Sequence, residues 1–293
     1  PGQLVVLEST VFPGATEELV APILEGSGLR AGEDFYLAFS PERIDPGNRR
    51  FKVREIPKLV GGINEASTRK AVEYYRQVFS TVVPMASARE AEMAKLLENT
   101  FRAVNIGLVN ELAIQAHQMG VNIWRVIDAA ATKPFGFMPF YPGPGWGGHC
   151  IPVDPVYLSW KVKASGGEAG FIDHAVHINN LMPGYVVQRL TDLLNEQGRS
   201  LRGSRILLLG VAYKRDVADV RESPALTILS LLKHKGSQVA YHDPYVPHLE
   251  HEGAWESQPL SPQLLLEQDC VVITTDHTGV DYELVARGSR LVL

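Results

Sequence analysis

Apolar and polar positions in the first third of the chain follow two spacings, one typical of strands and the other of helices. A short apolar run at 4–10 is stopped by Pro13 and Gly14 and is followed by a helical pattern at 16–24. Three further strand-like runs and one helical pattern come next, at 35–39, 58–60 and 81–84 and at 65–79. This alternation predicts an α/β layer structure with parallel strands.

The segment 90–119 is predicted to be one long helix, because apolar residues recur in it at spacings of three and four and no proline interrupts it. The apolar residues are Met93, Leu96, Leu97, Val104, Leu108 and Leu112. We expect Gly120 to end the helix. Lys95 and Asn99 are four residues apart and Asn110 follows eleven residues later, so a polar stripe is expected beside the apolar one.

The segment 133–155 is crowded with Gly and Pro and is expected to be an ordered loop between two domains. A helical stretch at 170–194 leads to an apolar run at 205–210, which begins a second α/β unit. Ser223 followed by Pro224 predicts a helix start. The rest of the unit is predicted as a helix to 235, strands at 238–242 and 270–275 and a helix at 263–268, with a further strand opening at 290–293.

Composition describes an ordinary globular chain of 293 residues, with 45% hydrophobic and 21% charged residues, long enough for one large or two ordinary domains. Apolar stretches are too short to span a membrane and the first residues lack signal-peptide features, so we expect a cytoplasmic protein without a membrane partner. The net charge of −5 and the absence of a Lys/Arg stripe argue against nucleic acid.

The two cysteines, Cys150 and Cys270, are too few for a disulfide framework or a structural zinc site. Cys150 lies in a Gly-rich loop four residues before Asp154. A cysteine in such a loop can form a thiohemiacetal or thioester, and a carboxylate can activate water. From the residues alone, the more common interpretation is that Cys150 is a small buried apolar residue and Asp154 a turn residue.

Other polar residues suggest weaker hypotheses. His149 is poorly placed to activate Cys150, because adjacent residues of extended backbone point to opposite sides. The pairs His174 with His177 and Asp276 with His277 lack a third ligand at a recognisable spacing, so no metal site is expected.

Five segments, in order and across almost the whole chain, resemble the signature blocks of the UDP-glucose/UDP-N-acetylhexosamine dehydrogenase family. They are Glu-Ser-Thr-Val-Phe-Pro-Gly at 8–14, Phe-Ser-Pro-Glu-Arg-Ile-Asp-Pro-Gly at 39–47, the Glu- and Leu-rich run at 90–100, the Gly- and Pro-rich run at 142–155, and the segment 210–224, which begins Gly-Val-Ala-Tyr-Lys. The resemblance implies an NAD-dependent oxidation of the C6 alcohol of a UDP-sugar to a carboxylate through a cysteine thioester.

The resemblance also implies roles for individual residues. Cys150 matches the nucleophile, Lys95 and Asn99 match the groups that stabilise the developing oxyanion, and Asp154 matches the aspartate that positions or activates water. Glu42 and Thr10 match the acid/base carboxylate and a hydroxyl near water and nicotinamide. Residues expected to bind the UDP-sugar are Glu42, Lys95, Asn99, Tyr141, Gly145, Gly147 and Lys214, and those expected to bind NAD are Thr10 and Arg221. Lys214 and Arg221 could instead pair only with Asp216 and Glu222.

The family opens with a strand and a Gly-x-Gly turn that holds the NAD pyrophosphate, and no such turn precedes Leu4. We therefore expect a fragment in which the N-terminal NAD-binding part is missing and which alone is inactive. The expected domains are the C-terminal part of the NAD-binding Rossmann-like domain at 1–87, a central helical dimerisation region with the cysteine loop at 88–200, and a truncated UDP-sugar-binding Rossmann-like domain at 201–293. The last offers the helix start at Ser223 to a phosphate.

Departures from the UDP-glucose pattern at Val153 and Pro46, and the run 137–145, resemble the bacterial N-acetylhexosamine branch. The expected substrate is therefore UDP-N-acetylglucosamine, with UDP-N-acetylmannosamine second and UDP-glucose a further alternative, in polysaccharide biosynthesis. Rival hypotheses are a single-hydride dehydrogenase of the 6-phosphogluconate or hydroxyacyl type and a non-catalytic UDP-sugar-binding module. The apolar stripe of 90–119 suits a homodimer interface, although it would equally serve an internal core.

Overall fold

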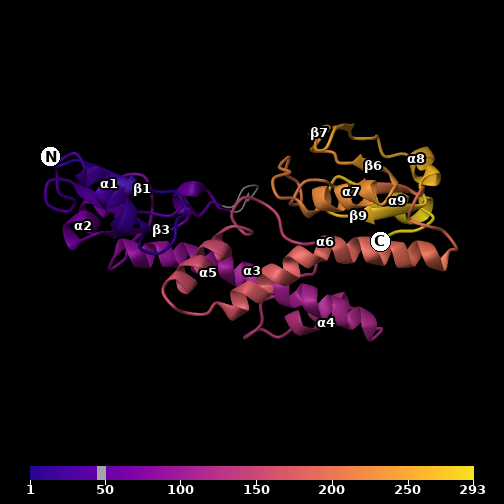
Figure 1. The fold of residues 1–293 in the computed structure, drawn as a ribbon, viewed down its shortest axis with the longest axis horizontal. Helices are drawn as coiled ribbons and strands as arrows, with labels where there is room; N and C mark the ends of the chain where they lie inside the picture. Colours follow the sequence, from indigo (N-terminus) through magenta and orange to yellow (C-terminus); the bar gives the residue numbers. More distant parts are fainter. Residues whose placement is uncertain (45–50) are drawn as a thin grey trace. The chain divides into compact units, whose positions relative to one another are not determined.

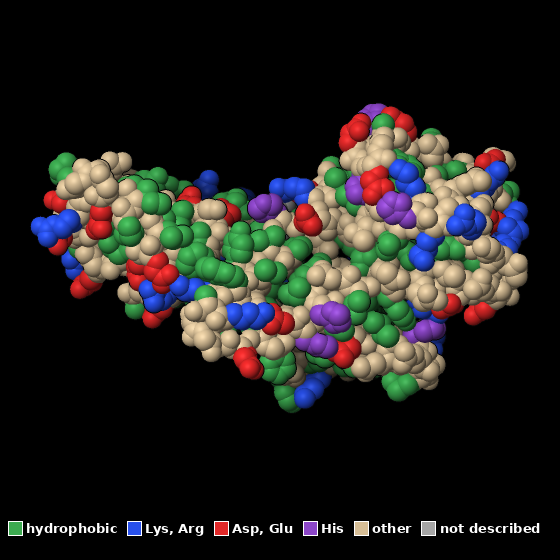
Figure 2. Space-filling view, in the orientation of Figure 1, with side chains coloured by type: hydrophobic (Ala, Val, Ile, Leu, Met, Phe, Trp, Pro, Cys, Tyr) green, Lys and Arg blue, Asp and Glu red, His purple; other side chains and the backbone are tan. Residues whose placement is uncertain are grey.

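The computed structural model describes residues 1–44 and 51–293 (Figure 1). They form two compact units, the first made of Pro1–Arg102 and Val153–Ile172 and the second of Ala103–Pro152 and Asp173–Leu293. In the described residues, no helix is both long and apolar enough to cross a membrane. On the face drawn in Figure 2, Lys and Arg side chains lie scattered among acidic ones.

The first unit is built on a four-stranded sheet of order β1-β2-β3-β4. The strands are β1 (Leu4–Leu7), β2 (Tyr36–Phe39), β3 (Lys58–Gly62) and β4 (Val82–Pro84). The pairs β1/β2 and β3/β4 are parallel, but β2 and β3 are antiparallel, so the expectation of parallel strands is wrong at this pair. A parallel neighbour needs a crossover, usually a helix, whereas the described part of the β2–β3 connection holds only the 3-10 turn Val53–Glu55.

Helices cover this sheet where the periodicity predicts them. The π-helix η1 (Thr16–Val20) continues into α1 (Ala21–Glu25), and α2 (Glu65–Tyr75) is capped by Asn64, whose side chain accepts a hydrogen bond from Ser67 N at 2.9 Å. Helix α2 buries Ala71, Val72 and Tyr75 against the sheet. The sequence did not predict α5 (Asp154–Ala164), which belongs to the same unit and begins where a loop was expected.

The long helix is confirmed as α3 (Ala88–Gln118), and Gly120 follows it with a φ of +69°. This left-handed conformation, which glycine adopts without a steric penalty, ends the helix as expected. A short helix that the sequence did not predict, α4 (Ile123–Ala131), starts immediately afterwards on a cap from Asn122. The helical stretch predicted at 170–194 is confirmed as α6 (Gly170–Glu196).

The second unit contains a doubly wound parallel sheet of order β6-β5-β9, as predicted. From residue 205 onward, the elements of this unit are β5 (Arg205–Leu209), α7 (Pro224–His234), β6 (Gln238–His242), the hairpin β7 (His248–Glu250) and β8 (Ala254–Glu256), α8 (Pro262–Glu267), β9 (Cys270–Ile273) and α9 (Tyr282–Gly288). Strand β5 is buried on both faces, with Ile206 and Leu208 in one core cluster and Leu207 and Leu209 in another. This explains its unbroken apolar run. The predicted closing strand is an isolated parallel bridge between Val271 and Val292.

Candidate functional site

The polar stripe of α3 faces the protein interior. Lys95, Asn99 and Asn110 are 7%, 1% and 0% exposed, whereas Leu97 and Leu108 are 59% and 51% exposed. Polar side chains of this kind are rarely buried without partners. The helix therefore presents polar groups inward over much of its length, and its apolar stripe lies largely on the exposed side.

The structure brings together two of the expected site residues, Asn99 and Asp154. The Asn99 side-chain amide donates a hydrogen bond of 2.5 Å to an Asp154 carboxylate oxygen, and its carbonyl oxygen accepts one from Arg102. Asp154 is 2% exposed and begins α5, with Pro155 in the first turn, where a missing N–H costs nothing. Lys95 lies one turn before Asn99 on the same helix. The first unit thus gathers three of the residues that the resemblance assigned to the reaction.

Thr10 lies half-buried just beyond the carboxyl end of β1, the edge at which open α/β sheets bind ligands. The chain that follows is fixed by the buried carboxylate of Glu92, which accepts hydrogen bonds from Gly14 N at 2.5 Å, Thr16 N at 2.9 Å and Thr16 Oγ1 at 2.6 Å. Burial raises the pKa of Glu92 in spite of these three donors. The sequence analysis missed Glu92, although its place three residues before Lys95 puts both on one side of α3.

Glu42 is exposed, and its carboxylate accepts a hydrogen bond from Ile44 N at 2.6 Å. The neighbouring Arg43 forms an ion pair of 2.6 Å with Glu98 of α3. Within the part of the chain that the structure describes, Glu42 makes no hydrogen bond to Lys95, Asn99 or Thr10. The substrate-choice position Pro46 lies outside the described residues.

The loop that carries Cys150 is ordered by contacts within the second unit. Gly143 N donates to Asn110 Oδ1 at 2.9 Å, and the Asn110 amide donates to Asn179 Oδ1 at 2.9 Å. The Trp146 indole N–H donates to Asn180 Oδ1 at 3.1 Å. Asn110 of α3 therefore holds the start of the Gly-rich loop by hydrogen bonds.

Cys150 is half-buried and His149 is exposed, while Cys270 is 1% exposed and its burial raises the pKa of its thiol to about 12. The two cysteines thus differ sharply in environment. Gly145 has a φ of +134°, and a side chain at Gly147 would clash with Tyr213. Among the described residues, no group of three or more His, Cys, Asp or Glu is arranged to hold a metal ion.

Lys214 and Arg221 lie on the segment that follows β5. Lys214 is half-buried, and the exposed Arg221 pairs with Asp219, donating to both carboxylate oxygens at 3.0 Å and 2.6 Å. The sequence had offered Asp216 and Glu222 as partners. Ser223 caps α7 as predicted, and its hydroxyl accepts from Ala225 N at 3.3 Å. Pro224 has no N–H, and the N–H groups of Ala225 and Leu226 already donate to the hydroxyl and the carbonyl oxygen of Ser223, so the expectation that this helix start offers N–H groups to a phosphate is wrong.

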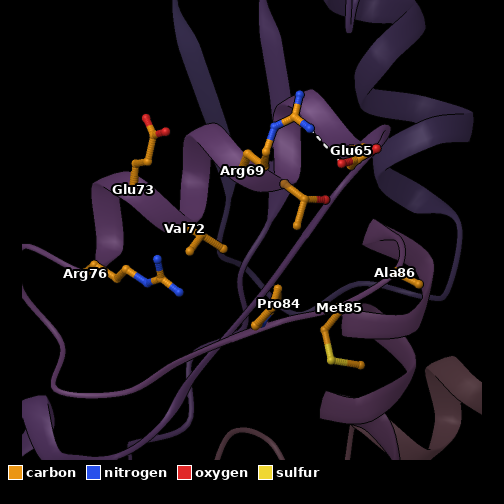
Figure 3. Close-up of a pocket in the computed structure, with 9 residues that line it drawn as sticks. Glu65, Arg69, Val72, Glu73, Arg76, Pro84, Met85 and Ala86 are labelled. Atoms are coloured by element: carbon orange, nitrogen blue, oxygen red, sulfur yellow. Dashed lines mark hydrogen bonds and ion pairs between the residues drawn. The ribbon is translucent and has the colours of Figure 1, made fainter.

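Of two cavities in the described residues, one is lined by an expected site residue and the other is not. A cavity of about 520 Å³ in the first unit lies between α2 and the chain at 84–86, is lined by the Arg69–Glu65 ion pair and Arg76, and contains no expected site residue (Figure 3). A cavity of about 1130 Å³ in the second unit is lined by Tyr141 and the following loop residues. Its size suits a nucleotide-sized ligand.

The walls of the larger cavity combine aromatic and charged groups. Tyr141 stacks on Trp124 with ring centroids 5.9 Å apart, and its hydroxyl donates to Asp128 at 2.9 Å. Arg189 and Arg215 add guanidinium groups to the lining. Asp276, which forms an ion pair with Arg215, lines the same cavity, so an anion would compete with this carboxylate for Arg215.

Comparison with protein-family models gives three matches that together cover most of the chain. The models describe the NAD binding domain, the central domain and the UDP binding domain of the UDP-glucose/GDP-mannose dehydrogenase family, and they match residues 1–79, 89–181 and 207–291. UDP-N-acetyl-D-mannosamine dehydrogenase of Pyrococcus horikoshii is 36% identical over 292 residues, covering 99% of this chain and 67% of that protein. The chain belongs to the UDP-glucose/GDP-mannose dehydrogenase family.

Other relatives carry related names. UDP-N-acetyl-D-glucosamine 6-dehydrogenase of Pseudomonas aeruginosa is 40% identical over 247 residues, 84% of this chain and 58% of that protein. The solved structure of the P. horikoshii UDP-N-acetylmannosamine dehydrogenase superposes with a TM-score of 0.88 over 99% of this chain and 68% of that one, at 36% identity. An NDP-N-acetyl-D-galactosaminuronic acid dehydrogenase of Methanosarcina mazei gives 0.86 over 99% and 64%, at 34% identity.

These matches confirm the expected family, the α/β fold with a long central helix and the association with NAD. The chain spans 58% and 67% of the two curated relatives named above. The expectation that the NAD-binding part is missing is not borne out, because residues 1–79 match the NAD binding domain of the family.

Proposed function

We propose that the protein is an NAD-dependent nucleotide-sugar 6-dehydrogenase that oxidises the C6 alcohol of a UDP-sugar to a carboxylate. The observation that carries the proposal is the buried hydrogen bond between Asn99 and Asp154, one helical turn from Lys95. An apolar pair of similar volume would pack α3 against α5 at least as well, because burying polar groups carries a desolvation cost. Asn99 and Asp154 are instead the kinds of group that stabilise a developing oxyanion and activate water in acyl transfer.

NAD⁺ supplies the hydride acceptor for two successive oxidations. The first converts the alcohol to an aldehyde, and Glu42 is the proposed acid/base group. The Cys150 sulfur then bonds to the aldehyde carbon, and loss of a second hydride from the thiohemiacetal gives a thioester. Water activated by Asp154 breaks the C–S bond, which releases the carboxylate and restores the thiol. One water is consumed, and two hydrides leave the substrate.

Positive and donor groups stabilise the negative charge that develops on the reacting oxygen. We assign this task to the Lys95 ammonium and the Asn99 amide, with Thr10 near the water and nicotinamide. Lys214 and Arg221 are proposed to bind phosphates. Tyr141, Gly145 and Gly147 are proposed to complete the substrate site, and of these three Tyr141 lines the cavity of about 1130 Å³.

For the sugar, UDP-N-acetylglucosamine is the first choice and UDP-N-acetylmannosamine the second. Relatives named for each of these substrates support both, at 40% and 36% identity. Epimers differ in one hydroxyl or amide position, and the selectivity rests on a few hydrogen bonds. UDP-glucose is the third candidate, and we propose that the reaction takes place in the cytoplasm.

The test measures the NADH formed per UDP-sugar consumed at limiting substrate, with the full-length protein and each of the three sugars. Two equivalents are expected with the true substrate, and Cys150→Ser is expected to abolish acid formation while UDP-sugar binding is retained. One equivalent in the wild type identifies a single-hydride dehydrogenase. Binding without turnover identifies a non-catalytic UDP-sugar-binding module.

We also propose a homodimer through α3, because Met93, Leu97, Leu108 and Leu112 of its apolar stripe are 41–59% exposed. Substituting one of them with a charged residue, as in Leu108→Glu, is expected to shift the protein to a monomer in sedimentation velocity. The matched control is Glu111→Lys, a charge change on an already polar position of the same helix. A wild-type protein that sediments as a monomer at micromolar concentration contradicts this part of the proposal.

A further inference from the structure

The Gly-rich loop that carries Cys150 rests on the side chain of Tyr213. A methyl group at Gly148 would lie 2.7 Å from Tyr213 Cε2, and one at Gly147 would lie 2.6 Å from Tyr213 Cβ. Gly148 has a φ of +87°, and its N–H donates to the Arg221 carbonyl at 3.0 Å. Both glycines are therefore needed for the loop to lie directly on the ring, two residues before Cys150.

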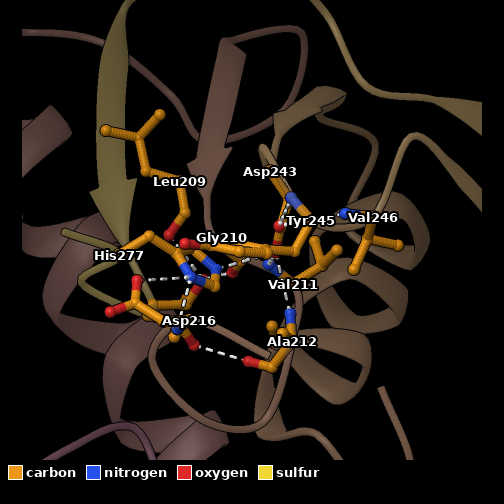
Figure 4. A network of polar contacts seen from close by, with 12 residues as sticks. Leu209, Gly210, Val211, Ala212, Asp216, Asp243, Tyr245, Val246 and His277 are labelled. Atoms are coloured by element: carbon orange, nitrogen blue, oxygen red, sulfur yellow. Dashed lines mark hydrogen bonds and ion pairs between the residues drawn. The ribbon is translucent and has the colours of Figure 1, made fainter. Parts of the chain in front are cut away.

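The turn that carries Tyr213 is held at its start by Asp243. One oxygen of this carboxylate accepts hydrogen bonds from Val211 N at 2.7 Å, Ala212 N at 3.0 Å and His277 Nε2 at 3.0 Å (Figure 4). The other oxygen accepts from Tyr245 N at 2.8 Å. Asp243 is 2% exposed, and such a buried carboxylate with several donors fixes each of them firmly.

The end of the same turn is held by His277, which is fully buried. Asp216 N donates to His277 Nδ1 at 3.0 Å, so the ring proton must sit on Nε2, which then donates to Asp243. Asp216 itself has a φ of +60°, an unfavourable value for a non-glycine residue. Its carboxylate accepts from Thr278 N at 2.9 Å and Thr278 Oγ1 at 2.8 Å. The turn from Val211 to Asp216 is thus clamped at both ends.

We propose that Tyr213 is a positioning residue for Cys150, and that Asp243 and His277 act through it by fixing its turn. This inference rests on the proposed function. Capture of the aldehyde requires the sulfur to stand within bonding reach of one carbon, and a displacement of about 1 Å can cost roughly 100-fold in rate. A loop that loses its support leaves the aldehyde uncaptured and stops the reaction after one hydride.

The experiment uses the full-length protein with the UDP-sugar that the wild type oxidises. NADH per sugar consumed is measured at limiting substrate, and aldehyde is trapped with a hydrazine after acid quench, so that both free and bound aldehyde are counted. We expect two equivalents and no aldehyde for the wild type and for the control Tyr213→Phe. For Tyr213→Ala we expect the ratio to fall toward one, with aldehyde accumulating. His277→Leu is expected to give an intermediate ratio.

The ratio of NADH formed to UDP-sugar consumed distinguishes a misplaced Cys150 from partial unfolding and from a lost substrate contact. Partial unfolding lowers the rate but leaves two equivalents per sugar, and a lost substrate contact raises KM without releasing aldehyde. Gly148→Ala pushes the loop away from the same ring and replaces Tyr213→Ala if that variant does not fold. Two equivalents and no aldehyde in these variants overturn the inference. One equivalent in the wild type contradicts the proposed function instead.

Discussion

Replacing Asn99 with alanine is expected to loosen the contact between α3 and α5. The Asn99 amide donates a hydrogen bond of 2.5 Å to the carboxylate of Asp154, a residue that is 2% exposed. The net contribution of a hydrogen bond to a charged group to the free energy of unfolding is about 1.5–3 kcal/mol. Truncation removes this donor and leaves the Asp154 carboxylate buried with one partner fewer. We expect the free energy of opening of α5 to fall by about 2 kcal/mol.

Hydrogen exchange followed by mass spectrometry measures this change locally. A peptide covering α5 is expected to exchange roughly 30-fold faster in Asn99→Ala, since about 1.4 kcal/mol corresponds to tenfold. The matched control is Glu98→Ala on the same helix. Its partner Arg43 forms a partly exposed ion pair, so the change is expected to be within about 1 kcal/mol.

A double-mutant cycle with Asp154→Ala isolates the pair. Because the two side chains touch, the losses in Asn99→Ala and Asp154→Ala are expected to be non-additive by about 1.5 kcal/mol or more. The combination of Glu98→Ala with Asp154→Ala is expected to be additive. Additivity of the Asn99 and Asp154 losses within about 0.5 kcal/mol would refute the contact and weaken the observation on which the proposed function rests.

Three further outcomes follow from the environments of single residues. At pH 8, iodoacetamide is expected to label Cys150 and spare the native Cys270, whose thiol is buried with a pKa of about 12; equal labelling in a peptide map contradicts this. Burial acts to raise the pKa of Asp243, but its hydrogen bonds outweigh burial and lower it from 3.8. Asp243 therefore stabilises the fold fully above about pH 4, and this stabilisation is lost as the pH falls further. In urea titrations below about pH 4, the free energy of unfolding of Asp243→Asn is expected to fall less steeply with decreasing pH than that of the wild type. Gly210→Ala, at a φ of +81° and against a backbone carbonyl oxygen, is expected to lose about 2 kcal/mol or more of stability, unlike Gly184→Ala, which meets nothing within 4 Å.

Local patterns predicted the long elements well and the short ones poorly. Helix α3 was predicted from apolar residues that recur at spacings of three and four, and strand β5 was predicted from its unbroken apolar run. Helix α5 was missed because Asp154 and Pro155 look like the end of a loop, although Pro is equally typical of a first helical turn. Periodicity also separates the two faces of α3 without saying which one is buried. That choice depends on partners such as Asp154, 55 residues away.

The site residues also divide into those recognisable from a local motif and those that depend on contacts distant in the sequence. Cys150, Lys95 and Asp154 stand in motifs that can be read along the chain, whereas Glu92 and Asp243 act through contacts with residues 76 and 32 positions away. Nothing in a local window specifies such a contact. Buried carboxylates surrounded by backbone N–H groups therefore have to be found in the structure.

Asp243 also gives a physical reason why the second α/β unit differs from a dinucleotide-binding domain. In such domains the N–H groups that follow the first strand are left open for a pyrophosphate. Here the corresponding groups of Val211 and Ala212, just after β5, already donate to the Asp243 carboxylate at 2.7 Å and 3.0 Å. An anion of the protein itself occupies the position that a phosphate would take. A phosphate bound by this unit is therefore expected to be bound by side chains such as Lys214, which fits a UDP-sugar better than NAD.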